Sequence, residues 1–188
     1  MYPLFYEKST RTRFSFCTAA HHLGMSQIWT EDAEAFSSAA KGETLEHTIR
    51  VLCQYEPDVI VLRHKENGAA ERAANIVDRY GYPVSIINGG DGNGQHPTQA
   101  LLDVYTIWGE LKRVHDFKIV IGGDLANGRT ARSLVYLLSK FRGIQFVFLS
   151  PESLRMRSDI LAHLEMHGVP FEVNTSVDEA LQDADVVY

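Results

Sequence analysis

The chain has 188 residues, of which 45% are hydrophobic and 22% charged, and its formal net charge is −6. This is the composition of a globular protein with one large or two small domains, and its acidic balance argues against non-specific nucleic-acid binding. No apolar run approaches the roughly 18 residues of a membrane helix, and the start does not resemble a signal peptide. We therefore expect neither a nucleic-acid partner nor a membrane partner.

Apolar and amphipathic segments alternate through the first part of the chain. In order, we expect a strand at 2–6, a helix at 10–24, a strand at 26–30, a helix at 44–55, a strand at 58–63, a helix at 68–81, a strand from 83 into a glycine-rich loop, and a helix at 96–111. Gly24 and Gly81 are typical helix stops, and Pro97 is tolerated in a first helical turn. This order predicts a parallel sheet with helices on both faces.

The same pattern then restarts. We expect strands at 117–124, 144–150, 170–174 and 185–188, and helices at 129–141, 158–168 and 176–184. A boundary near residues 112–116 gives an α/β protein of two lobes, 1–112 and 113–188, each a parallel sheet with helices on both faces. Because the sequence starts abruptly and stops inside its last strand, we expect material to be missing at both ends and the second lobe to be incomplete.

Cysteine and histidine give no metal-site pattern. Cys17 and Cys53 are far apart and outside any CxxC pair, which is typical of reduced thiols in a cytosolic protein. His163 and His167 share a helix face, but no third ligand follows in the sequence, so we expect no metal.

The run "STRTR", residues 9–13, lies between a predicted strand and a predicted helix. The unpaired N–H groups and dipole of a helix N-terminus favour an anion, and Ser9, Thr10 and Thr12 add hydroxyl donors. Arg11 adds a planar group suited to phosphate oxygens. Equally, Ser9 or Thr10 is a simple N-cap and the arginines are solvated, and the run alone leaves both interpretations open.

Several other polar residues are expected at the carboxyl ends of strands, where ligands bind in such folds. His96 and Gln99 share one face at a helix start, where His96 can donate to a carbonyl oxygen and Gln99 can accept from an NH2 group; the alternative is a satisfied loop histidine. Arg63 ends a buried strand and is either an ion-pair partner or a ligand contact. The second lobe places Arg129 at a helix start, without a Walker lysine motif or GxGxxG.

The loop "SSAAKGETL" carries Ser37, Ser38 and Lys41, and its composition is that of a flexible surface loop. Across all of these segments, donors and positive charge dominate, and no strong carboxylate acid/base pair stands out. This pattern suits a phosphorylated, carbonyl-bearing substrate, with catalysis by positioning and electrostatics.

Five motifs occur in a characteristic order: "STRTR", "KGETL", "IVLRH…GAA", "HPTQALLD" and "GDLANGRT". In this order and at these intervals they resemble the catalytic chain of aspartate carbamoyltransferase, from about residue 4 to the last residue. STRTR and HPxQ also occur in ornithine carbamoyltransferase, whereas Thr98, the "ALLD" that follows and the "KGETL" loop favour the aspartate enzyme.

The resemblance implies the transfer of the carbamoyl group of carbamoyl phosphate to L-aspartate, in pyrimidine biosynthesis, without cofactor or metal. The implied ligands of carbamoyl phosphate are Ser9, Thr10, Arg11, Thr12, Arg63, His96 and Gln99, of which Arg11, Thr12, Arg63, His96 and Gln99 are also the implied catalytic residues. Arg129 and Lys41 are implied to bind aspartate. Ser37 and Lys41 resemble residues that the family lends to a neighbouring subunit, which implies a homotrimer with shared active sites; a regulatory chain is possible in this family. The cysteine usage, by contrast, is what leads us to expect a cytoplasmic protein.

The chain departs from the family in three respects. Lys8 stands where proline is usual, Cys17 stands where glutamate is common, and the second aspartate-binding segment, a later Pro-Leu loop and the terminal helices lie outside residues 1–188. We expect this chain to keep carbamoyl phosphate binding better than turnover. Two alternatives remain: an ornithine carbamoyltransferase, and a non-catalytic homologue that binds carbamoyl phosphate as a partner subunit.

Overall fold

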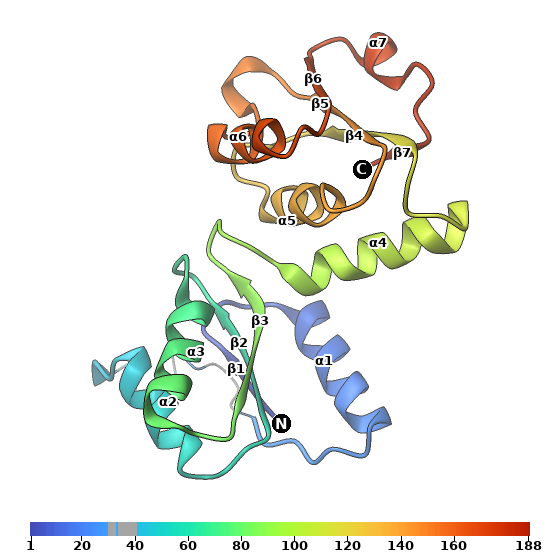
Figure 1. Cartoon of the computed structure of the whole chain (residues 1–188). Coiled ribbons are helices and arrows are strands. Elements are labelled where there is room, and N and C mark those ends of the chain that lie inside the picture. Colours follow the sequence, from blue (N-terminus) through green and yellow to red (C-terminus); the bar gives the residue numbers. More distant parts are fainter. Residues whose placement is uncertain (30–32, 34–40) are drawn as a thin grey trace. The chain divides into compact units, whose positions relative to one another are not determined.

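The structure is a computed structural model that describes residues 1–29, 33 and 41–188 (Figure 1). The chain divides into two compact units, which we call unit 1, Met1–Gln95, and unit 2, His96–Tyr188. Each unit contains one parallel sheet with helices packed on it, which confirms the predicted α/β class.

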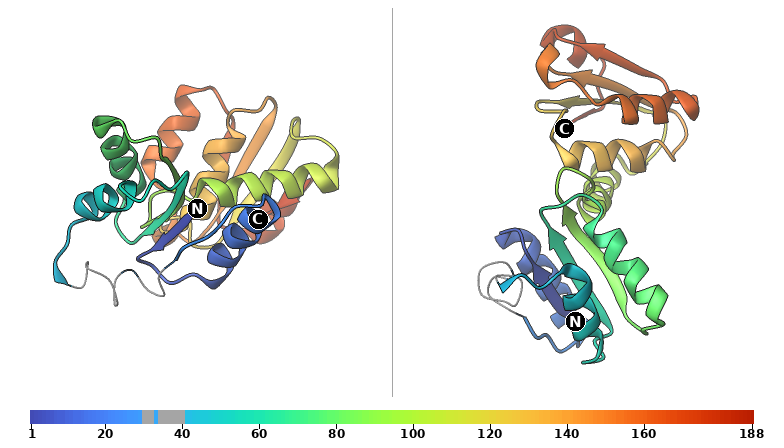
Figure 2. Two further views of the ribbon diagram at one scale, coloured as in Figure 1. Left: turned by 90° about the horizontal axis from the view of Figure 1, so that it is seen from below. Right: turned by 90° about the vertical axis from the view of Figure 1, so that its left-hand side faces the viewer.

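Unit 1 is a three-stranded sheet in the order β1-β2-β3. Its elements are β1 (Tyr2–Phe5), α1 (Thr10–His22), α2 (Leu45–Cys53), β2 (Val59–His64), α3 (Ala69–Tyr80) and β3 (Ser85–Asp91). Helices α2 and α3 pack on one face of the sheet through a core that includes Ile49, Leu62 and Ala73, and α1 packs on the other face through Ala20 and Phe5 (Figure 2). This arrangement confirms helices on both faces.

The helix ends of unit 1 follow local sequence signals. Thr44 is the N-cap of α2, and its side chain accepts from the backbone N–H of His47 at 3.3 Å. Gly24, just beyond α1, has φ +70°, and Gly81, the C-cap of α3, has φ +65°, so both stop a helix in the left-handed conformation that favours glycine.

Unit 2 contains a four-stranded sheet in the order β6-β5-β4-β7. Its elements are α4 (Pro97–Leu111), β4 (Phe117–Gly122), α5 (Arg129–Leu138), β5 (Ile144–Leu149), a 3-10 helix (Glu152–Leu154), α6 (Ser158–Met166), β6 (Phe171–Asn174), α7 (Val177–Leu181) and β7 (Val186–Val187). One face of the sheet packs on α4, α5 and α6 through Phe146, Leu134 and Leu164. The other face packs on α7 through Val147 and Ala180.

Some sequence expectations differ from the structure. Among the described residues of the predicted strand at 26–30 there is no strand: Met1 bonds to Ser26 and Ile28, but no ladder extends from these two hydrogen bonds. Helix α5 ends at Leu138 rather than at Phe141, and α7 ends at Leu181 rather than at residue 184. The two compact units divide before α4, because α4 packs against α5 and shares its core; the domain boundary near residues 112–116 stays a prediction.

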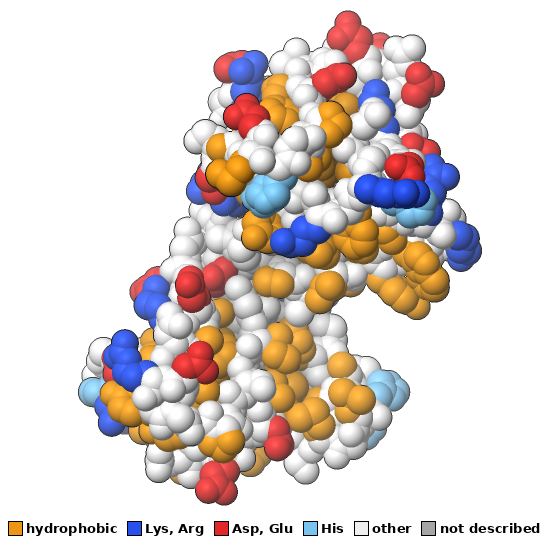
Figure 3. All heavy atoms as spheres, in the orientation of Figure 1, with side chains coloured by type: hydrophobic (Ala, Val, Ile, Leu, Met, Phe, Trp, Pro, Cys, Tyr) orange, Lys and Arg blue, Asp and Glu red, His pale blue; other side chains and the backbone are white. Residues whose placement is uncertain are grey.

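Within the described residues, every helix is too short or too polar to cross a membrane. Helix α4 has an outward stripe of large apolar side chains on its own unit, formed by Leu101, Leu102, Tyr105 and Trp108 (Figure 3).

Candidate functional site

The first turn of α1 keeps the features of an anion site. Ser9 has extended backbone and caps the helix, with its hydroxyl oxygen accepting from the backbone N–H of Thr12 at 3.4 Å. Thr10 and Arg11 are exposed, and the first turn contains no acidic residue. The positive end of the helix dipole is therefore not offset by a carboxylate in this turn. Ser9 is thus an N-cap, as one interpretation held, and the cap leaves the cationic first turn open to an anion.

Arg63 is buried at the end of β2, where its side chain is fixed at two points. Its Nη1 donates to the carbonyl of Gly89 at 2.9 Å, and its Nη2 lies 2.6 Å from Oε1 of Glu7. The register of the sheet pairs Phe5 with Arg63, so the residues that follow β1 run beside the end of β2. The sequence left an ion pair and a ligand contact open, and the structure shows the ion pair.

Glu7 was missed by sequence reasoning. It stands two residues before Ser9, so the ion pair connects the guanidinium of Arg63 to the segment that leads into α1. An acidic residue directly after a strand was the available signal. Its partner could be identified only once the parallel pairing of β1 and β2 was known.

Asp91, at the end of β3, organises the loops at this edge of unit 1. Its buried carboxylate accepts from the backbone N–H of Gln95 at 2.8 Å and from that of Gly68 at 2.9 Å. One side chain therefore ties the loop before α3 to the loop after β3. The sequence marked this segment only as glycine-rich.

Gly92 belongs to the same arrangement. Its φ is +51°, and a Cβ there would lie 2.2 Å from Oδ1 of Asn67 and 2.6 Å from the carbonyl oxygen of Lys65. Its own N–H donates to the carbonyl of His64 at 2.8 Å. Both its conformation and this close approach require glycine.

His96 begins unit 2 as the N-cap of α4, and Pro97 occupies the first turn as expected. The backbone N–H of His96 donates to Oγ of Ser133 at 2.8 Å, and its Nδ1 lies 3.4 Å from the hydroxyl of Thr98. The side chain is buried and held at the start of the helix. Three residues on, Gln99 donates from Nε2 to Oδ1 of Asp103 at 2.9 Å.

Arg129 is the first residue of α5, as the sequence predicted for a helix start. The preceding turn is closed by Asp124, whose carboxylate accepts from the N–H of Asn127 at 3.0 Å and whose carbonyl accepts from Gly128 at 3.0 Å. A Cβ at Gly128 would lie 2.6 Å from that carbonyl oxygen, so the turn requires glycine.

The predicted site residues therefore fall into two sets. Unit 1 brings together Ser9, Thr10, Arg11 and Thr12 on α1, with Arg63 linked to their segment through Glu7. Unit 2 holds His96, Gln99 and Arg129 at the starts of α4 and α5. Lys41 is exposed before α2. Ser37 and Ser38 lie outside the described residues.

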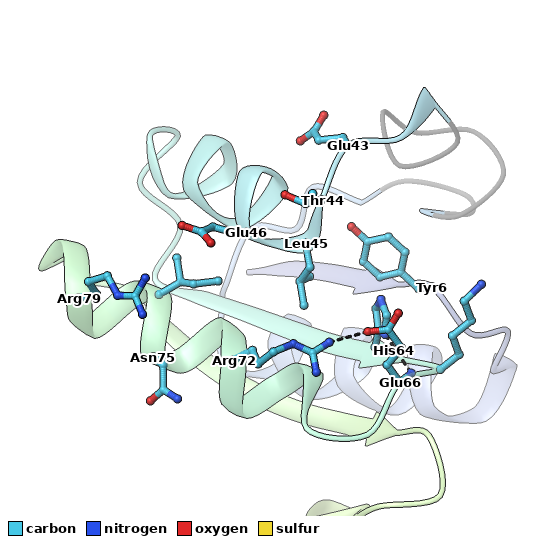
Figure 4. A pocket seen from close by; sticks show the side chains of 12 residues that line it. Tyr6, Glu43, Thr44, Leu45, Glu46, His64, Glu66, Arg72, Asn75 and Arg79 are labelled. Carbon is cyan, nitrogen blue, oxygen red and sulfur yellow. Dashed lines mark hydrogen bonds and ion pairs between the residues drawn. The ribbon is translucent and has the colours of Figure 1, made fainter.

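The described part of unit 1 includes two hollows that bear on the site. One of about 490 Å³ is lined by Lys8, Ser9, Thr10, Arg13, Phe14, Cys17, Gln27 and Trp29. Lys8 and Cys17, the two positions where this chain carries a residue unusual for the family, therefore line the same hollow as the N-cap Ser9. The other hollow, of about 700 Å³, lies between the N-terminal end of α2 and one face of α3, where Arg72 forms an ion pair with Glu66 (Figure 4). The predicted substrate ligands do not line this larger hollow.

In unit 2, α5 and α6 are joined by polar contacts. Arg132 forms a bidentate pair with Asp159, at 3.0 and 2.5 Å, and this hydrogen bonding lowers the pKa of the Asp159 carboxyl. His163 lies 3.0 Å from Oγ of Ser139 through Nε2. Partial burial, with His167 and Lys140 nearby, lowers the pKa of His163.

Metal-ligand chemistry is sparse in the parts of the chain that the structure describes. No group of three or more His, Cys, Asp or Glu side chains there could hold an ion. The rings of His163 on α6 and of His167 just beyond it are tilted against each other with centroids 4.3 Å apart, and Cys17 and Cys53 are free thiols.

Two family profiles match the chain. Residues 1–109 match the "Aspartate/ornithine carbamoyltransferase, carbamoyl-P binding domain", and residues 115–188 match the "Asp/Orn binding domain" of the same enzymes. Among curated proteins, aspartate carbamoyltransferase 2, chloroplastic, of Pisum sativum is 53% identical over 188 residues, covering 100% of this chain and 47% of that protein. The aspartate carbamoyltransferase catalytic subunit of Methanocaldococcus jannaschii is 48% identical over 185 residues, covering 98% of this chain and 58% of that protein.

A solved structure of an aspartate transcarbamoylase has a similar fold. The aspartate transcarbamoylase of Trypanosoma cruzi in complex with N-(phosphonacetyl)-L-aspartic acid superposes with a TM-score of 0.88 at 41% identity, covering 100% of this chain and 58% of that chain. This chain therefore spans about half the length of the curated relatives it matches.

Proposed function

Because the chain belongs to the aspartate/ornithine carbamoyltransferase family, we propose that it is the part of an aspartate carbamoyltransferase that binds carbamoyl phosphate and begins the aspartate site. The reaction is the transfer of the carbamoyl group to the amino group of L-aspartate, with release of phosphate, as a step of pyrimidine synthesis. The observation that carries the proposal is the match of both family domains along the chain. The two relatives described above, 53% and 48% identical to this chain, are both named as aspartate carbamoyltransferases.

In the proposed mechanism, the phosphate group binds at the first turn of α1, with Ser9, Thr10, Arg11 and Thr12 as donors. The uncompensated helix terminus and the exposed Arg11 support this assignment. Arg63 contacts both the phosphate and the carbamoyl oxygen. Because Arg63 already pairs with Glu7, an incoming phosphate must share or replace that carboxylate.

The carbamoyl carbon is attacked by the amine of aspartate, and negative charge then grows on the carbonyl oxygen. Arg63, Thr12 and His96 are the proposed donors to that oxygen, so stabilisation is greatest where charge develops. Gln99 accepts from the carbamoyl NH2. Arg129 and Lys41 bind the carboxylates of aspartate, and the bond to phosphate breaks as the new C–N bond forms.

The domain division that we propose for this function is 1–112 for carbamoyl phosphate and 113–188 for the first part of the aspartate domain. The spans of the two family profiles, 1–109 and 115–188, support it. Under this division α4 belongs to the first domain, because the first family profile covers most of this helix. In the structure, however, α4 packs with the rest of unit 2.

We also propose a homotrimer in which Ser37 and Lys41 act in the neighbouring subunit's site. The exposure of Lys41 on unit 1 supports this role. Mass photometry gives the oligomeric state. Mixing an inactive Lys41→Ala chain with an inactive Arg63→Met chain should restore activity if sites are shared, and no recovery from a mixed oligomer would refute sharing.

Location in the cytoplasm is likewise a proposal. The Pisum sativum relatives are named as chloroplastic, so imaging of the tagged natural protein distinguishes cytoplasm from plastid.

The test of the function is an assay for carbamoylaspartate, with L-ornithine as the competing acceptor, on this chain and on any longer protein that contains it. We expect carbamoyl phosphate to bind and aspartate, not ornithine, to be carbamoylated. Product from ornithine alone would favour the ornithine enzyme, and binding without any product would favour a non-catalytic homologue.

A further inference from the structure

Gln99 and Asp103 stand one turn apart on α4, and their side chains meet. Nε2 of Gln99 donates to Oδ1 of Asp103 at 2.9 Å, and both side chains are half-buried. The other carboxylate oxygen of Asp103, Oδ2, is buried and has no hydrogen-bond partner within the described residues. The measured hydrogen bond of Asp103 goes to the amide of Gln99, and the Tyr188 hydroxyl also interacts with this carboxyl.

The surroundings of Asp103 come from three elements of unit 2. Burial raises the pKa of the Asp103 carboxyl, while the Gln99 amide on α4 and the Tyr188 hydroxyl after β7 oppose the rise. The Tyr188 hydroxyl also interacts with Thr130 in the first turn of α5, next to Arg129. Burial, and to a lesser degree Asp103, raise the pKa of Tyr188, so this hydroxyl carries a proton that it can donate to the carboxylate.

The chemistry of this pair decides which end of the Gln99 amide faces outward. An ionised carboxylate can only accept hydrogen bonds, so Asp103 forces the NH2 of Gln99 toward itself. The carbonyl oxygen, Oε1, must then point away from Asp103. Without the carboxylate, the two ends of the amide are nearly alike in shape and can exchange places.

We propose that Asp103 is a positioning residue that orients Gln99 so that its amide carbonyl accepts from the NH2 of the substrate, making the site selective for carbamoyl phosphate over an acyl phosphate of the same shape. The inference rests on the proposed function, because it assigns Gln99 to the carbamoyl group. If Asp103 were only a half-buried residue that stabilises α4, its replacement would not change the selectivity between the two acyl phosphates.

Acetyl phosphate is the matched probe, since a methyl group replaces the NH2 of carbamoyl phosphate. The experiment measures the dissociation constants of both acyl phosphates and of inorganic phosphate. We expect the unmodified protein to prefer carbamoyl phosphate, and Asp103→Asn to lower the ratio of the two affinities by about tenfold, the scale of one lost hydrogen bond. The affinity for inorganic phosphate should not change.

Two further variants separate positioning from general damage. Glu110→Gln removes one carboxylate from the exposed side of the same helix and should leave the ratio unchanged. Gln99→Ala should lower the ratio, and adding Asp103→Asn to Gln99→Ala should lower it no further, because Asp103 acts only through Gln99. A second drop of equal size in the double variant would overturn the proposal.

The pH dependence of the unmodified protein gives a test that needs no variant. A protonated Asp103 can donate to Oε1 and so turn the amide around. The ratio should therefore fall as the pH is lowered from about pH 8 to about pH 4, while the similar ionisation of the two acyl phosphates cancels. If Asp103→Asn does not fold, a ratio that stays constant with pH overturns the proposal.

The outcomes also separate the inference from the function on which it rests. If the unmodified protein binds neither acyl phosphate, both fail. If it prefers carbamoyl phosphate and Asp103→Asn keeps that preference, the positioning role fails and the proposed function stands.

Discussion

Among the described residues, Arg63 of unit 1 and Arg132 of unit 2 are both buried and both pair with a carboxylate, and the two pairs differ in where the carboxylate lies. Arg63 is 6% exposed and Arg132 is 7% exposed, so the two guanidinium groups are equally buried. Nη2 of Arg63 donates to Glu7, in the segment that leads into α1, and Nη1 of Arg63 donates to the backbone carbonyl of Gly89. Arg132 grips both oxygens of Asp159 and ties α5 to α6.

Burial of an arginine therefore does not by itself identify a ligand contact. The Arg132 pair joins two regular helices through a bidentate contact, which suits a fixed structural contact. The Arg63 pair lies at the carboxyl ends of parallel strands, where ligands bind in such folds, so we expect a phosphate to displace it. Three predictions test this difference, and a fourth concerns the pH dependence of the α5–α6 contact.

Arg63→Met should have the largest effect. It removes the proposed phosphate contact together with the ion pair to Glu7, so the dissociation constant of carbamoyl phosphate should rise about 100-fold or more, the scale of a truncated charge pair. Isothermal titration measures it. Unchanged affinity in a folded variant would remove Arg63 from the binding site.

Arg132→Met should lower the free energy of unfolding by about 2 kcal/mol, less than a fully buried pair costs because the Asp159 side chain is 59% exposed. Urea unfolding measures this loss. The affinity of the folded fraction for carbamoyl phosphate should stay within about twofold of the original. A loss of affinity as large as that of Arg63→Met would end the distinction between the two arginines.

Glu7→Gln should act in the opposite direction on binding. The substitution removes a negative charge that competes with phosphate for the Arg63 guanidinium, so inorganic phosphate should bind about threefold more tightly. Competition titration with phosphate checks this. Weaker phosphate binding would show that Glu7 orients Arg63 rather than competing for it.

The α5–α6 contact should also give a small pH dependence. The pKa of His163 is lowered in the folded state, so the folded protein favours the neutral ring; its contribution to stability is complete above the unfolded pKa of about 6.5 and is lost as the pH falls below it. In His163→Asn this decline should disappear. Unfolding curves between about pH 8 and about pH 5 measure it, and an unchanged decline in the variant would point to another group.

Features that depend on a few neighbouring residues were predictable from the sequence. Gly24 and Gly81 ended their helices, Pro97 began one, and Arg129 stood at a helix start as expected. Each is a local choice of backbone conformation. The alternation of strands and helices likewise fixed the α/β class, since buried parallel strands need crossover helices.

Features that depend on strand register were not predictable. Glu7 meets Arg63 only because Phe5 pairs with Arg63, and Asp91 reaches Gly68 only because β2 and β3 are neighbours. The segment at 26–30 contains Ile28 and Trp29 and was predicted as a strand, yet its described part makes only two hydrogen bonds to Met1, at the edge of the sheet. The composition of a segment alone does not show whether it will add a further strand to the edge of a sheet.

The carboxylate of Asp91 and the tight fit of Gly92 also constrain how this protein can change over evolutionary time. The loop before α3 and the loop after β3 share their hydrogen bonds and leave no room for a side chain between them. An insertion in either loop alone would separate Asp91 from one of its two N–H donors. Loop grafting between relatives should therefore succeed when residues 65–68 and 91–95 are exchanged together, and fail when one is exchanged without the other.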